Sequence, residues 1–286
     1  MVPMDSDKYP TESDRRRFVK GVAGGAAMAA ISTAAGAAIE GTTTGSGTGG
    51  GSVTYRAAKN TDGPAPRGLP QIPLELDDEG YLKGVWPESE ERELEDGTTV
   101  TVAEMELGGV TYSTQWFQYC GCQTFQNVQP DGDYDNYMRY SANTRLGWQS
   151  SERSIGERVH VDHFDDYADW GNGIGDDGYG KPANCTWRSQ DIDSGETLPI
   201  QVIRSTRVER AAEEDEWLAD STVDGFIAFL NKCTHFCCIP GFKDSSDAPK
   251  FGAANKSYCG CHQSVYDPFE VVERSFTALP RPNSDG

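Results

Sequence analysis

Basic residues are scarce in this sequence, and lysine is the scarcer of the two basic types. Lys and Arg together number 25 against 45 Asp and Glu, so the formal net charge is -20 at pH 7. Because the phosphates of a nucleic acid would be repelled, this balance excludes nucleic acid as a partner. The acidic residues are spread along the chain and do not form a tail. This favours a protein of a halophile, in which salt screens self-repulsion, over an ordinary solvated acidic surface.

Long apolar runs are also lacking, apart from one weakly hydrophobic stretch near the N-terminus. Gly21–Ile39 carries no charged residue and has about the length that a helix needs to cross a bilayer. It follows Asp14–Lys20, in which a pair of arginines, an apolar residue and a lysine resemble the twin-arginine export signal. Within the stretch, Ala35–Ala37 has the small-x-small form of a signal-peptide cleavage site. We therefore expect an Ala/Gly-rich signal-anchor helix within residues 1–39, with a buried Ala-rich helix as the alternative. The functional part would then lie on the extracytoplasmic side of the cell membrane, where disulfides persist.

Three regions follow the predicted anchor. Residues 40–68 begin with a run of Gly, Thr and Ser and are expected to form a flexible tether. Residues 69–230 are expected to form a base domain, and residues 231–286 a small subdomain that holds five of the cysteines and has a Pro-rich C-terminus. Within the base domain, Asp131–Tyr179 is rich in Asp, Tyr, Gly and Asn with little periodicity. We expect it to be a long acidic surface excursion.

The secondary-structure signals are mostly those of short strands separated by turns. One helical pattern is present, in Arg207–Leu218, where apolar residues recur at helical spacing. Strands are expected from alternation and β-branched residues at Leu69–Trp86 (with a turn at Asp77–Gly80), Val100–Thr114, Leu198–Thr206, Gly225–Leu230 and Val271–Phe276. Short strands with one short helix predict a mainly antiparallel β fold.

Two cysteine–histidine motifs carry the chemistry. Cys233 and His235 form a Cys-x-His pair, and Cys259 and His262 form a Cys-x-x-His pair further along the chain. Each pair can supply one thiolate and one imidazole, which together make the four ligands of a [2Fe–2S] cluster. Replacing two thiolates on one iron by neutral imidazoles removes negative charge and raises the reduction potential.

The two motifs resemble those of the Rieske [2Fe–2S] subunit of cytochrome bc-type quinol-oxidising complexes. The resemblance implies one [2Fe–2S] cluster per chain, with Cys233 and Cys259 on one iron and His235 and His262 on the other. It also implies an antiparallel Rieske-type β-sandwich in which residues 231–286 are the cluster-binding subdomain. With the acidic composition, the expected source is a halophilic archaeon.

Further positions match the family. Cys238 and Cys261 correspond to the disulfide that joins the two cluster loops. Ser264 and Tyr266 correspond to the hydroxyls that donate hydrogen bonds, the first to a bridging sulfide and the second to a cysteine sulfur, and thereby raise the potential. Cys237 stands where the family usually has Gly, as does Gln263 in the second motif, and Gly260 stands where Pro is common.

The family resemblance also implies a function. His262 would contact a membrane quinol, and the cluster would take an electron together with a proton. The tethered head would then pass the electron to a cytochrome c-type or other carrier. The protein would be the redox subunit of a quinol–cytochrome c reductase-type complex, beside a cytochrome b-type membrane subunit.

The closing part of the family fold is displaced in this sequence. In the family, a proline-rich loop and closing strands usually follow the second motif, and Leu279–Pro282 could be that loop. Gly63–Pro66, followed by the strand-like Leu69–Trp86, resembles the same loop and tail. We hypothesise that Leu69–Trp86 supplies the missing edge strands, as in a permuted chain.

Other interpretations of these residues remain. A zinc site also takes Cys and His, but Cys-x-His is an unusual spacing for it, and plain disulfides would leave the histidines without a role. Cys120-Gly-Cys122 resembles Cys259-Gly-Cys261, but Gln123 stands in place of the histidine, so a second cluster is not expected. A disulfide among Cys120, Cys122 and Cys185 and no such disulfide are both open, and one unpaired cysteine is expected. His160 and His163 are expected to be surface histidines in an acidic loop, and not metal ligands.

Three other functions compete with quinol oxidation. The small Rieske subunit of an arsenite oxidase-type enzyme can share the motif and the export signal. A dioxygenase-linked ferredoxin fits less well, because that group generally lacks the cysteines that match Cys238 and Cys261. A non-redox surface protein held by disulfides would be colourless.

Overall fold

The computed structural model describes residues 51–93, 97, 99–120, 122, 135–192 and 197–278. The predicted signal anchor in residues 1–39 and the segment Leu279–Pro282 lie outside these residues. No helix in the described ranges is long and apolar enough to span a membrane. Thr43–Gly286 forms one compact unit, which contains both the predicted base domain and the predicted subdomain.

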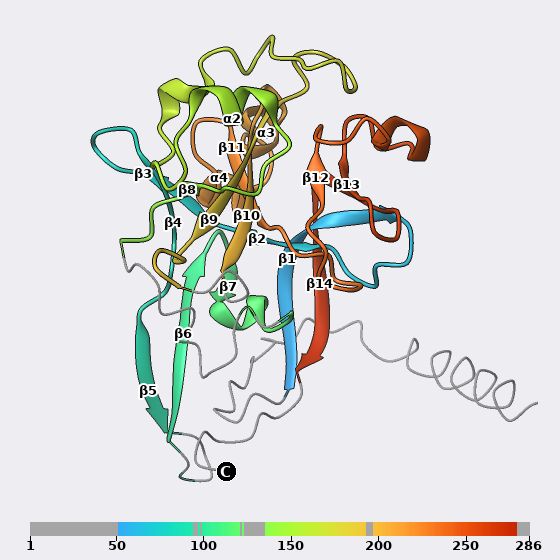
Figure 1. The fold of residues 1–286 in the computed structure, drawn as a ribbon. Helices are drawn as coiled ribbons and strands as arrows, with labels where there is room; N and C mark the ends of the chain where they lie inside the picture. The colour runs from blue at the N-terminus through green and yellow to red at the C-terminus, as the bar shows by residue number, and fades with distance from the viewer. Residues whose placement is uncertain are drawn as a thin grey trace, which may run out of the picture. The chain divides into compact units, whose positions relative to one another are not determined.

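A nine-stranded sheet forms the body of the protein, in the order β12-β13-β14-β1-β2-β11-β10-β9-β8. Every neighbouring pair in it is antiparallel, so the prediction of a mainly antiparallel β fold is confirmed. Figure 1 shows the sheet curling around the long pair β1 and β14. The strands are β1 (Gly51–Asp62), β2 (Leu69–Ile72), β8 (Arg139–Tyr140), β9 (Lys181–Trp187), β10 (Leu198–Arg204), β11 (Phe226–Leu230), β12 (Gly241–Phe242), β13 (Ser257–Cys259) and β14 (Ser264–Ala278).

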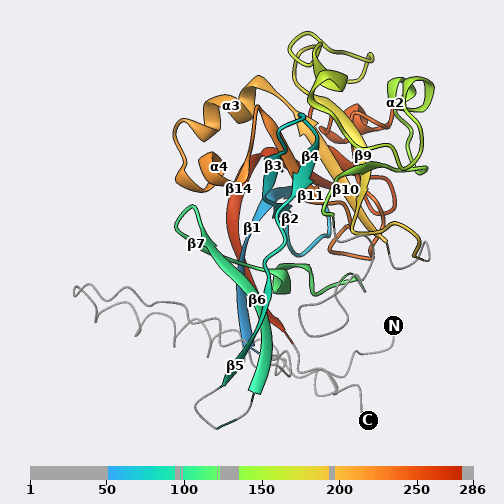
Figure 2. The same ribbon diagram turned by 90° about the vertical axis from the view of Figure 1, so that its left-hand side faces the viewer.

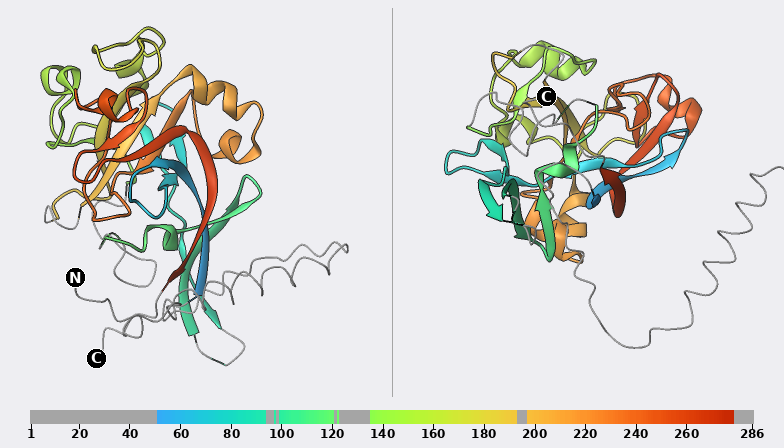
Figure 3. Two further views of the ribbon diagram at one scale, coloured as in Figure 1. Left: turned by 90° about the vertical axis from the view of Figure 1, so that its right-hand side faces the viewer. Right: turned by 90° about the horizontal axis from the view of Figure 1, so that it is seen from below.

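Strand β1 corrects the predicted flexible tether, because it occupies twelve residues of the range 40–68. Val53, Tyr55 and Ala57 alternate along it and are all buried, which is the pattern of a strand with one face in the core. The strand pairs with β14 from Gly51 to Asp62, and Figure 3 shows the two running side by side. The Gly- and Ser-rich residues before it concealed this alternation in the sequence.

Two smaller sheets complete the β structure. β3 (Leu74–Leu76) and β4 (Leu82–Gly84) form a hairpin whose turn is the predicted one at Asp77–Gly80. The Asp77 carboxylate accepts hydrogen bonds from the backbone N–H groups of Glu79 and Tyr81, as an Asx turn requires. β5 (Ser89–Glu93), β6 (Thr99–Leu107) and β7 (Val110–Ser113) form a three-stranded meander.

The hypothesis about Leu69–Trp86 is correct in part. The stretch belongs to the structure around the cluster loops, since β2 pairs with β1 on one side and with β11 on the other. It is not an edge, however, because β2 is interior to the sheet and β3–β4 stands apart as its own hairpin.

Three short α-helices occur in the described chain, where one was expected. α3 (Thr206–Ala212) and α4 (Glu216–Ser221) divide the predicted helical segment and lie side by side in Figure 2. Ser205 and Asp215 cap their N-termini by accepting backbone N–H groups, which explains the break between them. The third helix, α2 (Gly147–Glu152), lies in the predicted excursion.

The excursion is less superficial than its composition indicates. Among its described residues, Tyr140, Val159 and Phe164 are fully buried. Phe164 packs edge-on against Phe226 of β11, with ring centroids 5.0 Å apart. These few apolar residues all enter the same core and are enough to hold the excursion against the sheet. Because they are so few, they produce little periodicity in the sequence.

Candidate metal centre

The first loop of the candidate centre begins where β11 ends. The Cys233 N–H donates to the carbonyl of Cys238 at 2.7 Å, and the Cys237 N–H donates to the carbonyl of Cys233 at 2.9 Å. These bonds fold residues 233–238 into a tight loop. Cys237 has a φ of 61° there, a conformation that glycine adopts without cost and other residues adopt rarely.

The second loop is the connection between β13 and β14. Cys259 and Ser264 are paired across the two strands, and the Gln263 N–H donates to the Cys259 carbonyl at 2.8 Å. Gln263 also takes a positive φ, 63°. Both departures from glycine therefore keep the left-handed backbone that the loops require.

The four predicted ligands meet between these loops. Cys233 and Cys259 are buried, free thiols. The imidazole rings of His235 and His262 have centroids 4.7 Å apart and stand nearly perpendicular. His262 is exposed, whereas His235 is half-buried and its Nδ1 is buried without a hydrogen-bond partner. Two free thiols, a pair of adjacent imidazoles and a ring nitrogen without a hydrogen-bond partner in the described chain are donor types that fit a metal cluster.

The two thiols are electrostatically unequal. A hydrogen bond from Cys259, helped by the Tyr266 hydroxyl and by backbone N–H groups, lowers the pKa of Cys233 to about 5. The same hydrogen bond raises the pKa of Cys259. A thiolate is the form that binds metal.

Both predicted hydroxyl residues lie at the centre. The Tyr266 hydroxyl is buried and donates to the Cys233 sulfur at 3.1 Å, as the resemblance implied. Ser264 is fully buried beside the second loop. Its Oγ accepts the backbone N–H of Ala65 at 3.2 Å, which holds the hydroxyl in place.

A third segment, Gly63–Arg67, closes the centre from the N-terminal side. Arg67 exchanges two hydrogen bonds with the Thr234 hydroxyl, one through its N–H at 3.3 Å and one through its carbonyl at 2.6 Å. Gly63 has a φ of 82°, and a Cβ there would come within 2.6 Å of the Gln263 carbonyl oxygen. The segment that resembles the family's proline loop thus contacts both cluster loops.

Two disulfides flank the centre. Cys238–Cys261 joins the two loops, as predicted. The alternative of a disulfide among Cys120, Cys122 and Cys185 is wrong, because Cys120 pairs with Cys237 and the other two are buried free thiols.

The sulfurs of Cys238, Cys259 and Cys261 lie within 4.8 Å of one another and form a possible metal-binding group. With Cys238 and Cys261 joined in a disulfide, Cys259 is the one member of this group that has a free thiol.

The Cys120–Cys237 bridge ties a further segment to the first loop. The Tyr119 hydroxyl donates to the Lys232 carbonyl at 2.9 Å, and the Lys232 ammonium donates to the Cys120 carbonyl at 3.2 Å. Burial raises the pKa of Cys122 to about 11, so this thiol stays neutral. The segment supports the backbone on which Cys233 sits.

An apolar rim surrounds the exposed imidazole. Phe236 is 66% exposed, and its ring centroid lies 4.3 Å from that of His235 and 5.2 Å from that of His262. Ile239, 46% exposed, is another large apolar side chain on the same loop. Phe236 was not singled out from the sequence, although its place between His235 and Cys237 could have indicated it.

His160 and His163 are not simple surface residues. Each side chain is less than one-fifth exposed. They cap the short 3-10 helix Val161–Phe164, where His160 Nδ1 accepts the Asp162 N–H and His163 Nδ1 accepts the His160 N–H. Burial, with nearby Arg153, lowers the pKa of His163. Their role in the structure is to hold this turn.

Comparison with known proteins gives no match. No protein-family model matches the chain, and neither a curated protein nor a solved structure matches it.

Proposed function

We propose that this protein carries a Rieske-type [2Fe–2S] cluster and transfers electrons from a membrane quinol. The observation that supports the proposal most directly is the convergence of two free, buried thiols with two adjacent imidazoles, all from two loops joined by a disulfide. Cys233 and Cys259 would hold one iron, and His235 and His262 the other. The cluster would supply a one-electron acceptor whose potential is raised by its neutral ligands.

The chain's own residues account for the remaining steps. His262 is exposed and can accept a hydrogen bond, and then a proton, from a quinol hydroxyl. Phe236 and Ile239 provide an apolar surface that would exclude water where a quinone ring approaches. The Tyr266 hydroxyl donates a hydrogen bond to the Cys233 sulfur, and with a cluster bound this bond would stabilise negative charge on the sulfur and favour the reduced state.

The wider assignment follows from the same proposal. The protein would be the redox subunit of a quinol–cytochrome c reductase-type complex, tethered to the extracytoplasmic side of the cell membrane beside a cytochrome b-type subunit. A cytochrome c-type or other carrier would receive the electron. The twin-arginine-like signal supports export of a folded, loaded protein.

Substitution of one imidazole tests the proposal. His262→Leu should lose stoichiometric iron, visible colour and quinol oxidation. The matched control is His160→Leu, which removes an imidazole that bonds the Glu79 carbonyl and lies outside the centre. It should keep all three. Iron content and quinol oxidation in His262→Leu equal to the unmodified protein would refute the assignment, and colourless protein without iron would favour the disulfide-stapled alternative.

A further inference from the structure

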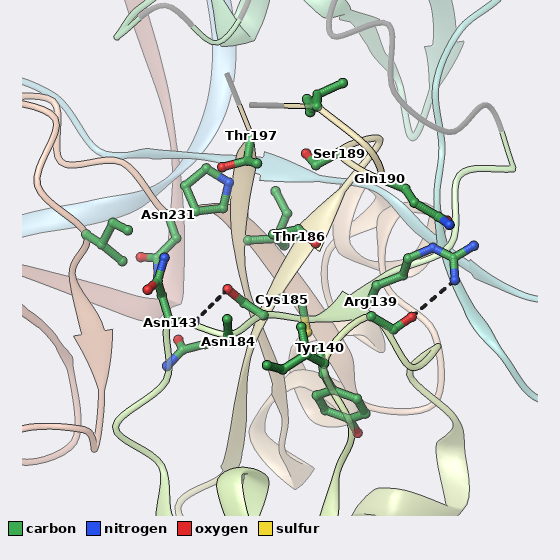
Figure 4. Close-up of a pocket in the computed structure, with 18 of the residues that line it drawn as sticks. Arg139, Tyr140, Asn143, Asn184, Cys185, Thr186, Ser189, Gln190, Thr197 and Asn231 are labelled. Atoms are coloured by element: carbon green, nitrogen blue, oxygen red, sulfur yellow. Dashed lines mark hydrogen bonds between the residues drawn. The ribbon is translucent and has the colours of Figure 1, made fainter. Parts of the chain in front are cut away.

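A cleft separate from the metal ligands lies beside the first cluster loop. It has a volume of about 690 Å³ and is bounded by β8, β9 and β10 on one side and by Cys237 and Ile239 on the other. This is within the roughly 300–1,000 Å³ of ordinary small-molecule sites. Figure 4 shows Asn143, Asn184 and Asn231 on one side of it and Arg139 and Gln190 on the other. We call it the asparagine cleft.

Two buried amide oxygens in its wall have no partner. Asn231 is 1% exposed and Asn184 is 6% exposed, and the Oδ1 atom of each lacks a hydrogen-bond partner. The Asn184 side-chain nitrogen donates to Thr144 Oγ1 at 3.3 Å, so its carbonyl oxygen is the unused end. A buried acceptor without a donor destabilises the folded protein, because it has lost its hydrogen bonds to water. A ligand with hydrogen-bond donors would recover that cost.

The backbone holds both amides in place. The backbone N–H of Asn184 donates to Gln149 Oε1 at 2.9 Å, and the backbone carbonyl of Asn184 accepts from Gln149 Nε2 at 2.8 Å. The Asn231 N–H donates to the Pro199 carbonyl at 2.7 Å. The backbone that carries both acceptors is therefore already fixed when a ligand arrives, which lowers the entropic cost of binding.

The charges of the residues that line the asparagine cleft limit which ligands it can bind. None of the described residues that line the cleft is acidic, although the chain carries a net charge of -20. A cationic ligand would find no carboxylate among these described residues. The Arg139 guanidinium is bonded to Asp135 and to the Gly156 carbonyl, and the Lys232 ammonium donates to the Cys120 carbonyl, so both lining cations already have partners and are poorly placed to take a phosphate. The side chains of Ile155, Ile192 and Ile239 offer apolar surface for C–H groups.

We propose that the asparagine cleft binds a small, uncharged polyhydroxy ligand such as a saccharide unit. Hydroxyl groups would donate to the amide oxygens of Asn184 and Asn231, and the C–H edges of the ligand would pack on the isoleucines. This site uses none of the proposed cluster ligands, and it stands independently of the electron-transfer function.

Saturation-transfer difference NMR and calorimetry on the full chain, in high salt, test the site with glucose, trehalose and sorbitol as probes. At least one probe should bind saturably, whereas glycine betaine, which has no N–H or O–H donor, should not. Asn231→Leu should weaken binding at least tenfold. It should also raise Tm without ligand, because an apolar side chain of similar shape removes an unpaired buried carbonyl.

Asn172→Leu is the matched control. Its amide donates to the Lys243 carbonyl at 2.7 Å and does not line the cleft, so the variant should lower Tm and leave binding unchanged. The proposal is overturned if no polyhydroxy probe binds saturably, if betaine binds as well as the probes, or if Asn231→Leu binds like the unmodified protein. A fall in Tm of Asn231→Leu as large as that of Asn172→Leu would equally overturn it.

Discussion

At the scale of single residues, the candidate centre is organised around one sulfur. Cys233 accepts hydrogen bonds from the Cys259 thiol and the Tyr266 hydroxyl, and its pKa falls as a result. Because an added electron makes a cluster more negative, donors on its sulfurs favour the reduced form. Tyr266 therefore raises the reduction potential further in our account, beyond the effect of the two neutral imidazole ligands.

Tyr266→Phe isolates this effect. The hydroxyl contributes about 1 kcal/mol more to the reduced state than to the oxidised state, which for a single electron corresponds to a potential lower by roughly 40 mV in the variant. Redox titration followed by visible spectroscopy measures the shift. An unchanged potential with an intact cluster would show that the 3.1 Å contact has no electrostatic role.

Sequence reasoning reached most residues of the centre because their spacing is local. Cys-x-His and Cys-x-x-His each define one loop, and the Cys238–Cys261 bridge follows from the family resemblance. The Cys120–Cys237 bridge joins residues 117 positions apart, and no local pattern indicates such a pairing. Only the fold brings these two cysteines together.

At the scale of elements, Gly63–Arg67 acts as a cover over two loops. Gly63 and Gly97 have nearly the same φ, 82° and 81°, but a Cβ at Gly63 would meet the Gln263 backbone, whereas nothing in the described chain lies within 4 Å of one at Gly97. An alanine at Gly97 would therefore bear only the cost of the positive φ, whereas an alanine at Gly63 would also collide with the Gln263 backbone.

Gly97→Ala should lower the free energy of unfolding by about 1–2 kcal/mol, the cost of the left-handed backbone alone. Gly63→Ala should lower it by about 1–3 kcal/mol more, because the cover must move away from the second loop. Urea unfolding compares the two. Equal losses would mean that the close contact of Gly63 with the second loop is not required.

The Cys120–Cys237 disulfide also holds the first cluster loop in place. Replacing both cysteines by Ser should lower Tm, through a loss of about 2–5 kcal/mol for a crosslink over so long a loop. Cys122→Ser changes a buried thiol without breaking a crosslink and should lower Tm less. A double variant as stable as the unmodified protein, by thermal unfolding in high salt, would mean that the bridge adds no support.

The strands also differ in whether local sequence or a distant pairing determines them. Leu198–Thr206 and Gly225–Leu230 were predicted correctly because β-branched and apolar residues mark β10 and β11 directly. β1 was missed, since a Gly-rich flank adjoins it and its partner β14 lies at the other end of the chain. The sheet order depends on that distant pairing, which no local window contains.

At the scale of the whole molecule, the centre is built from parts far apart in sequence. Gly63–Arg67, Tyr119–Cys120 and the two cluster loops meet because β1 and β14 pair along their length. β1 ends at Asp62, directly before Gly63–Arg67, so the same pairing that joins β1 to β14 also positions this cover.

The most direct test of the central claim is pulsed electron paramagnetic resonance of the dithionite-reduced full chain, with iron quantified in the same sample. We expect two irons per chain and nitrogen couplings from two inequivalent imidazoles, which His235 and His262 would provide. Zinc in place of iron, no metal, or a reduced cluster without nitrogen couplings would contradict the account.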